Sequence, residues 1–263
     1  MDRTLYKATF SKQEVPAWTC PICRKGTLKL LEDSLTSRET SLSASQHAHD
    51  AWWPDFIQYV YSCMFQCSTC KDWIASSGVG GVSLEIEIDH HGEPDQVWSD
   101  YFRPRFFEPP LAVIDLPLEC PETVSAPIVE SFRLFFCSPA SAANHVRIAL
   151  EELLTELGVR RFIVKRSKRQ LLSLHSRIGM LDAKYSHLRD LFLAIKWLGN
   201  AGSHAQVEVT NDDVLDAYEL VNHVLEELYA HKTKKVKAIA KRVNKKKGPT
   251  KATTRNRAMR SKP

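Results

Sequence analysis

Long apolar segments are absent from this sequence of 263 residues. No run of about 18 uncharged apolar residues occurs, so we expect no membrane-spanning helix and no membrane partner. The first residues, MDRTLYKATFSKQEVP, lack the apolar core of a secretory signal, so we expect a cytoplasmic protein. In a reducing compartment the seven cysteines are not expected to form disulfides. Membrane-spanning proteins and disulfide-stabilised secreted proteins are therefore excluded.

Acidic residues are missing from the C-terminal segment, residues 232–263. This segment contains 14 Lys or Arg, whereas the rest of the chain carries 22 basic and 31 acidic residues. The body of the chain is therefore acidic and its C-terminal segment very basic, and the overall net charge of +5 hides this difference. Because the segment has few large apolar side chains, it cannot bury enough surface to fold alone. We predict a disordered basic tail over residues 231–263.

Charge is the only recognition chemistry that this tail offers. Lys245, Lys246, Lys247, Arg255 and Arg257 can displace counterions from a phosphate backbone, which predicts binding of RNA or DNA. No aromatic side chain is interleaved with them, so base stacking is not indicated. Attachment to the acidic body of the same or another copy fits the charge imbalance equally well. A solvated tail with no binding function is the third interpretation.

Two Cys-x-x-Cys pairs, Cys20 with Cys23 and Cys67 with Cys70, carry the most specific signal. Each pair can hold one metal ion through two thiolates, and tetrahedral zinc takes four such ligands. A redox pair needs no second copy, so one zinc ion per chain is the better interpretation. Because four thiolates leave no open position, we expect this zinc to be structural and not catalytic.

Other possible ligands are assigned to different roles. The 43 residues between Cys23 and Cys67 exceed the usual spacing of about 15–20, and an exposed Ser-rich loop at 33–50 accounts for the excess. Cys63 fits the pairs less well and is predicted to be a core thiol. His47 and His49 lie within the polar loop and are predicted to be solvated.

The sequence divides into four parts, and we predict an α+β fold class. Residues 1–98 are predicted to form a β-rich zinc ribbon-like module, in which residues 82–89 alternate like a half-buried strand. Residues 99–123 contain several prolines and are predicted to be an extended linker. Residues 124–230 show helical periodicity and predict an antiparallel α-helical bundle. The basic tail completes the chain.

Apolar stripes at helical spacing define the bundle. They cover residues 142–157, 171–181, 188–198 and 214–228. Gly158 is the expected stop of the first stripe, and Thr210 begins the last helix with a capping box. Gly199 and Asn200 are interpreted as the cap that ends the third helix, with Gly199 in a left-handed conformation. Arg147 and Glu151 are expected to form an ion pair along one helix.

Several of these motifs resemble one known family. The helix at 141–158, the Leu-Gly-Asn-x-x-x-His run at 198–204 and the Trp-x-Cys-Pro-x-Cys knuckle at 18–23 carry the resemblance, which spans roughly residues 15–230. The family is an uncharacterised bacterial zinc-knuckle plus HEPN-like helical domain family, of the domain of unknown function 4145 type. Its members are often restriction- or defence-associated. The resemblance implies a HEPN-like bundle and a homodimer.

The resemblance also bears on catalysis. Many HEPN relatives are metal-independent ribonucleases that use an Arg, a following polar residue and a His a few positions on. Asn200 and His204 match the last two positions, whereas Gly199 stands at the position of the Arg. We therefore predict a noncatalytic zinc-binding accessory protein that binds nucleic acid or a protein partner in defence against foreign nucleic acid. The alternative is a metal-independent ribonuclease using Asn200 and His204.

Overall fold

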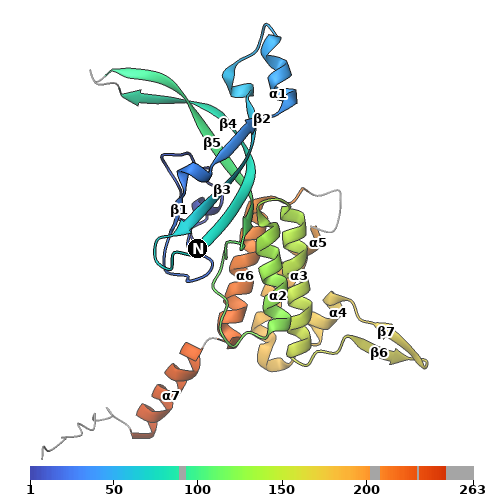
Figure 1. Cartoon of the computed structure of the whole chain (residues 1–263). Coiled ribbons are helices and arrows are strands. Elements are labelled where there is room, and N and C mark those ends of the chain that lie inside the picture. Colours follow the sequence, from blue (N-terminus) through green and yellow to red (C-terminus); the bar gives the residue numbers. More distant parts are fainter. Residues whose placement is uncertain (89–92, 202–207, 230, 247–263) are drawn as a thin grey trace, which may run out of the picture.

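The computed structural model describes residues 1–88, 93–201, 208–229 and 231–246 (Figure 1). It is a mixed α+β structure, with a curled antiparallel sheet in the N-terminal part and helices after it. This agrees with the predicted fold class. Among the described helices, none has both the length and the apolar character needed to cross a membrane.

The N-terminal sheet has five antiparallel strands. They are β1 (Leu28–Leu30), β2 (Thr36–Glu39), β3 (Gln58–Cys67), β4 (Trp73–Ile88) and β5 (Pro94–Glu108). Strand β3 pairs with β4 along one edge, and β1 and β2 share its other edge. Phe10 adds a bridge to Phe102 on the outer strand β5. The inner face buries Trp18, Phe65 and Phe102 among other side chains.

The prediction of an exposed loop at 33–50 is wrong for its middle part, which forms a strand and a short helix. Residues 36–39 form β2, which pairs with residues 59–62 of β3, and the short helix α1 (Ser41–Ser45) follows. Thr40 caps α1 by accepting a hydrogen bond from the Ser43 backbone N–H, and the Ser43 side chain is buried. The residues of β2, Thr-Ser-Arg-Glu, do not alternate between apolar and polar, so the sequence does not show that they pair with β3. Their polar composition suggested a loop instead.

The strand predicted at 82–89 exists as the end of β4, but it is not half-buried. Leu84, Ile86 and Ile88 are 47, 69 and 68 % exposed. They lie on the part of the β4–β5 hairpin that extends beyond the other strands, which Figure 1 shows as a long arm. No layer of the described residues covers this apolar face, because β1, β2 and β3 end before the arm begins.

The predicted linker at 99–123 begins inside the sheet. Strand β5 runs to Glu108, and its pairing with β4 shifts register between Ser77 and Gly78, opposite Pro104. Proline lacks a backbone N–H, so an outer strand with an irregular register is the place where a sheet tolerates it. Only the stretch after Glu108 is an extended connection, and it leads to helix α2 (Glu122–Phe135).

The C-terminal part packs helices around one core. Helix α3 (Pro139–Glu156) packs against α2, α5 (Arg189–Ala201) and α6 (Asn211–Tyr229). Helices α5 and α6 also contact each other, and the short α4 (Leu174–Gly179) lies beside α5. Tyr218 is fully buried at the centre, where its hydroxyl hydrogen-bonds to Ser131. Thr210 and Asp213 form the predicted capping box at the start of α6. Gly158 directly follows the C-cap residue of α3 and has a left-handed φ of 83°, as expected for the residue that stops this helix.

The stripe at 171–181 is not one helix. Residues 162–171 form a two-stranded ribbon, β6 (Phe162–Lys165) and β7 (Lys168–Leu171), and only residues 174–179 are helical. Leu174 and Ile178 are buried as the stripe requires, whereas Leu171 is 66 % exposed. The four apolar residues of the stripe therefore lie in β7, in α4 and, for Leu181, just after α4.

The predicted disordered tail is partly a helix. Residues 231–246 form α7 (His231–Lys246), which follows α6 almost directly (Figure 1). Lys, Arg and Ala, which dominate this stretch, have high helix propensity, so a helix forms without a core to bury. Residues 247–263 lie outside the described residues.

The N-terminal residues connect the two parts of the molecule. Arg3 forms ion pairs with Asp216 and Glu219 of α6 at 2.6 and 2.9 Å. A few residues later, Phe10 is inserted in the core of the sheet. Phe107 of β5 and Phe136 after α2 also contact each other, with ring centroids 5.2 Å apart. The sheet and the helices are thus joined by side chains from both ends of the N-terminal module.

Candidate metal centre

The four predicted cysteine ligands come together at one end of the sheet. Cys20 and Cys23 lie in the turn before β1, and Cys67 and Cys70 lie at the turn between β3 and β4. The pairing of Leu28 with Cys67 holds the two turns side by side. Strand pairing therefore closes the gap of 43 residues in the sequence.

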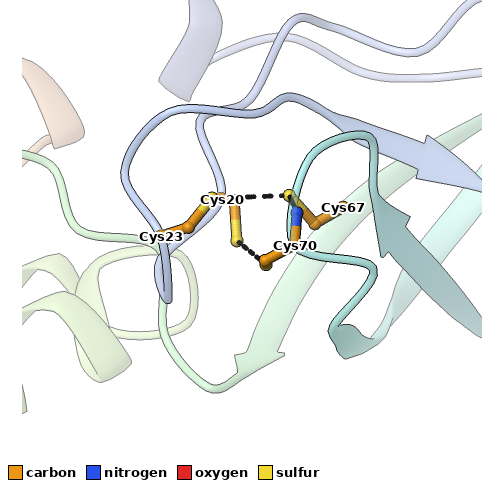
Figure 2. A group of neighbouring side chains, drawn as sticks. All are labelled: Cys20, Cys23, Cys67 and Cys70. Atoms are coloured by element: carbon orange, nitrogen blue, oxygen red, sulfur yellow. Dashed lines mark hydrogen bonds between the residues drawn. The ribbon is translucent and has the colours of Figure 1, made fainter.

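The sulfur atoms have the spacing of a tetrahedral metal site. Cys20 Sγ lies 3.8 Å from Cys70 Sγ, and Cys23 Sγ lies 3.6 Å from Cys67 Sγ. All four ligand atoms lie within 4.8 Å of one another (Figure 2). Zinc–sulfur bonds of about 2.3 Å in a regular tetrahedron give sulfur–sulfur edges of about 3.8 Å. The four cysteines therefore fit one tetrahedral ion.

The two turns repeat the same backbone conformation. Arg24 and Lys71, which follow the second cysteine of each pair, have φ values of 57° and 64°. Their backbone N–H groups donate to the carbonyls of Cys20 and Cys67 at 3.0 and 3.2 Å. Left-handed φ is costly for these residues. Its repetition closes each Cys-x-x-Cys turn so that both of its sulfurs point toward the other pair.

Backbone N–H groups surround the sulfurs with positive dipoles. Thr69 and Cys70 donate to Cys67 Sγ at 3.3 and 3.4 Å. Burial acts to raise the pKa of the Cys67 thiol, but these N–H groups, together with hydrogen bonds from the Cys70 and Cys20 side chains, lower it overall. N–H groups of Gly26 and Lys25 lower the pKa of Cys23 to about 6. Cys23 and Cys67 therefore ionise more readily than an ordinary thiol, whereas burial raises the pKa of Cys20. The thiolate is the form that binds a metal cation.

Gly26 is a residue of the site that the sequence analysis missed. A Cβ at this position would lie 2.6 Å from Cys67 Sγ and 2.7 Å from Thr69 Oγ1. Only glycine lets the first turn approach the sulfur of the second pair so closely. The signal was present as a glycine three residues after Cys23.

The other possible ligands lie apart from this centre. Cys63 is a core thiol as predicted, 4 % exposed, and burial raises its pKa to about 12. His47 is exposed, and its ring lies against Trp52 while its Nε2 is 2.8 Å from Glu39 Oε1. His49 is exposed. The metal-ligand group found among the described residues contains none of these three.

The centre is also tied to the connection that leads into the helices. The Arg24 guanidinium forms an ion pair with Asp115 and donates to the carbonyl of Ala112 at 3.2 Å. Arg24 belongs to the first cysteine turn, so this turn and the connection to the helices are joined directly by one side chain.

The Gly199–Asn200 pair is not a helix cap. Helix α5 continues through both residues to Ala201, and Gly199 is buried at its crossing with α3. A Cβ on Gly199 would lie 2.4 Å from Arg147 Cβ and 3.0 Å from the Ala143 carbonyl oxygen. The glycine is therefore required by helix packing and not by a left-handed φ. His204 lies outside the described residues.

We expect Gly199→Ala to destabilise the protein by about 1–3 kcal/mol, since inserting a methyl group at this crossing forces α3 and α5 apart. Gly179→Ala is the matched control, because nothing lies within 4 Å of that position in α4. Urea unfolding midpoints measure both effects. Equal midpoints for the two variants would contradict the tight crossing.

Arg147 forms the predicted ion pair with Glu151 on α3. Of the tail cations proposed to bind nucleic acid, Lys245 is exposed on α7 and Lys246 is the last residue of that helix. Lys247, Arg255 and Arg257 lie outside the described residues. The structure therefore places two of these five cations, at the end of α7.

Two family models match the chain. One, described as a domain of unknown function (DUF4145), matches residues 129–246. The other, described as a domain of unknown function (DUF8608), matches residues 8–107. No curated protein and no solved structure matches the sequence. The first match supports the family resemblance drawn from residues 141–158 and 198–204, and it extends to the end of α7.

Proposed function

We propose that the protein is a noncatalytic zinc-binding accessory protein that binds nucleic acid, in a defence setting of the kind suggested by its resemblance to restriction-associated proteins. The observation that carries the proposal is the closed four-sulfur set of Cys20, Cys23, Cys67 and Cys70. When bound, zinc supplies a cross-link between the two turns and leaves no position for a substrate. The role of the zinc would then be structural: it would stabilise the end of the sheet at which β1, β3 and β4 meet.

The packing of Gly199 supports the noncatalytic proposal over the ribonuclease alternative. An arginine at this position would have to place its side chain where Arg147 and Ala143 already lie. Asn200 therefore has no motif arginine before it on α5. An RNA substrate is expected to stay full length in the presence of the protein.

The basic segment supports nucleic acid as the partner. Eight Lys or Arg lie between 231 and 246 and six more lie between 247 and 263. A helix concentrates the first eight along one short element, where they can neutralise neighbouring phosphates. The rest of the chain carries a net negative charge, so the basic segment is expected to make the main contact.

We expect truncation after Tyr229 to weaken binding to DNA or RNA and to flatten its dependence on salt. Removing one phosphate contact reduces the steepness of log affinity against log salt by about 0.9 for duplex DNA. Truncation after Lys246 is the matched control and separates the cations of α7 from those beyond it. Fluorescence anisotropy across a salt series measures both. Unchanged binding after removal of residues 230–263 would place the contact elsewhere.

A protein partner is the second candidate, and one observation favours it. The apolar face of the β4–β5 arm exposes Leu84, Ile86 and Ile88 beside Trp98, which is 39 % exposed. A second copy of this chain is the proposed occupant, because a two-fold axis would cover the same stripe on both chains. In that case truncation after Tyr229 leaves the association intact.

A further inference from the structure

A second basic block lies inside the otherwise acidic body. Residues 157–181 contain seven Lys or Arg and neither Asp nor Glu. The first acidic residue after this block is Asp182. The block includes β6 and β7, which pair with each other and with no further strand among the described residues. Figure 1 shows them projecting from the helices as a two-stranded ribbon. We call residues 162–171 the basic ribbon.

The basic ribbon contains two features that destabilise a hairpin, a pair of opposed cations and a strained turn. The cations Lys165 and Lys168 are exposed and stand directly opposite each other in the register, where like charges repel. Arg166 and Ser167 form the turn with φ values of 50° and 59°. Two-residue hairpins favour Asn-Gly there, because left-handed φ strains other residues. An arginine at the tip therefore costs stability that a bound anion would offset.

A cavity of about 310 Å³ opens at the root of the ribbon, beside Phe162. We call it the root pocket, and Arg147, Arg161 and Arg177 line it. Arg147 and Arg161 are paired with Glu151 and Glu152. The pocket thus combines three guanidinium groups with the base of the basic ribbon.

Arg177 is the unusual member of this group, because it is only 2 % exposed. It donates to Thr155 Oγ1 at 2.8 Å and to the Val159 carbonyl at 3.2 Å, both neutral acceptors. Its Nε is buried without a hydrogen-bond partner among the described residues. Burial and the nearby Arg161 lower its pKa. Glu151, which also lines the pocket, and Glu152 act on Arg177 in the opposite direction, but they form their ion pairs with Arg147 and Arg161. A buried cation without a direct ion-pair partner is costly, so a bound anion would supply that partner.

We propose that the basic ribbon binds the phosphate backbone of duplex DNA and that the root pocket receives one of its phosphates. The inference rests on the proposed function, and it adds a second contact on the helical part. A two-stranded ribbon fits the wide major groove of B-form DNA. The deep, narrow major groove of A-form RNA does not admit it, so DNA is the favoured duplex.

The test compares two triple variants of the full chain that each remove three positive charges. The ribbon variant is Lys165→Ala, Arg166→Asn and Lys168→Ala, in which Asn suits the left-handed turn and protects the fold. The control variant replaces three exposed cations of the N-terminal part with Ala: Lys12, Lys29 and Arg103. Binding to a DNA duplex and to an RNA duplex of equal length is measured across salt.

We expect the wild type to lose about 40-fold more DNA affinity than the ribbon variant between about 50 and 200 mM salt, for three phosphate contacts. The control variant should follow the wild type. Equal slopes for both variants would overturn the ribbon contact while the proposed function stands. Failure of the wild type to bind either duplex would overturn the proposed function as well. A loss confined to the RNA duplex would overturn the assignment to DNA.

Inorganic phosphate tests the root pocket separately. Millimolar phosphate is expected to raise the melting temperature of the wild type and of the ribbon variant, because both keep Arg177. The increase should vanish in Arg177→Met, which fills a similar volume without charge. An equal increase in Arg177→Met would overturn the pocket.

Discussion

Loss of one ligand, in Cys20→Ser or Cys70→Ser, is expected to release the metal and unfold the sheet end that β1 and β3 form. Metal analysis of the wild type should find about one zinc per chain. Structural zinc contributes apparent folding free energies of about 10–16 kcal/mol in small zinc domains, so few other changes will have a larger effect. The four sulfurs already stand at tetrahedral spacing, and each one removed leaves an open position.

Two control variants separate metal binding from cysteine chemistry in general. Cys137→Ser changes a partly buried thiol in the helical part, so it should keep the full zinc content and stability. Cys63→Ala should keep zinc but lose stability, because this thiol is buried in the core of the sheet. Gly26→Ala is expected to weaken zinc retention against a chelator, since its Cβ would meet Cys67 Sγ. Full zinc in Cys70→Ser would remove that residue from the site.

Phe10→Ala is expected to destabilise the N-terminal part by about 3–5 kcal/mol, the usual cost of removing a buried aromatic ring. The Phe10 ring is 2 % exposed and contacts four others: Trp18, Tyr61, Phe65 and Phe102, with centroids 5.4–5.9 Å away. Its backbone also exchanges hydrogen bonds with Phe102 at 2.9 and 2.7 Å. The variant thus creates a cavity and loosens the segment that reaches α6.

Phe106→Ala is the matched control for this prediction. It removes the same side chain from the neighbouring strand β5, where it is 54 % exposed. We expect it to change stability by only about 0.5 kcal/mol. Denaturant unfolding followed by Trp fluorescence measures both variants, because Trp18 is buried beside Phe10. Equal destabilisation by the two variants would show that the N-terminal segment does not complete the core.

The metal ligands and the helix signals were determined by the sequence. Thiolate spacing within each pair is a local property, and Cys20, Cys23, Cys67 and Cys70 need only be brought together to form the centre. The capping box at Thr210 and the left-handed Gly158 are likewise decided within a few residues. Such features survive in any tertiary context, because the atoms that make them are neighbours along the chain.

Tertiary structure decided what Gly199, Phe10 and residues 162–171 do. The end of an apolar stripe looks the same whether glycine stops a helix or lets another helix cross it, and only the position of Arg147 makes the difference. The pairing of Phe10 with Phe102 joins segments with no shared local pattern. Leu171, the last residue of the basic ribbon, was assigned to the helical stripe at 171–181, and no element was predicted over residues 162–170. Each depends on contacts between residues far apart in the sequence, which local periodicity does not encode.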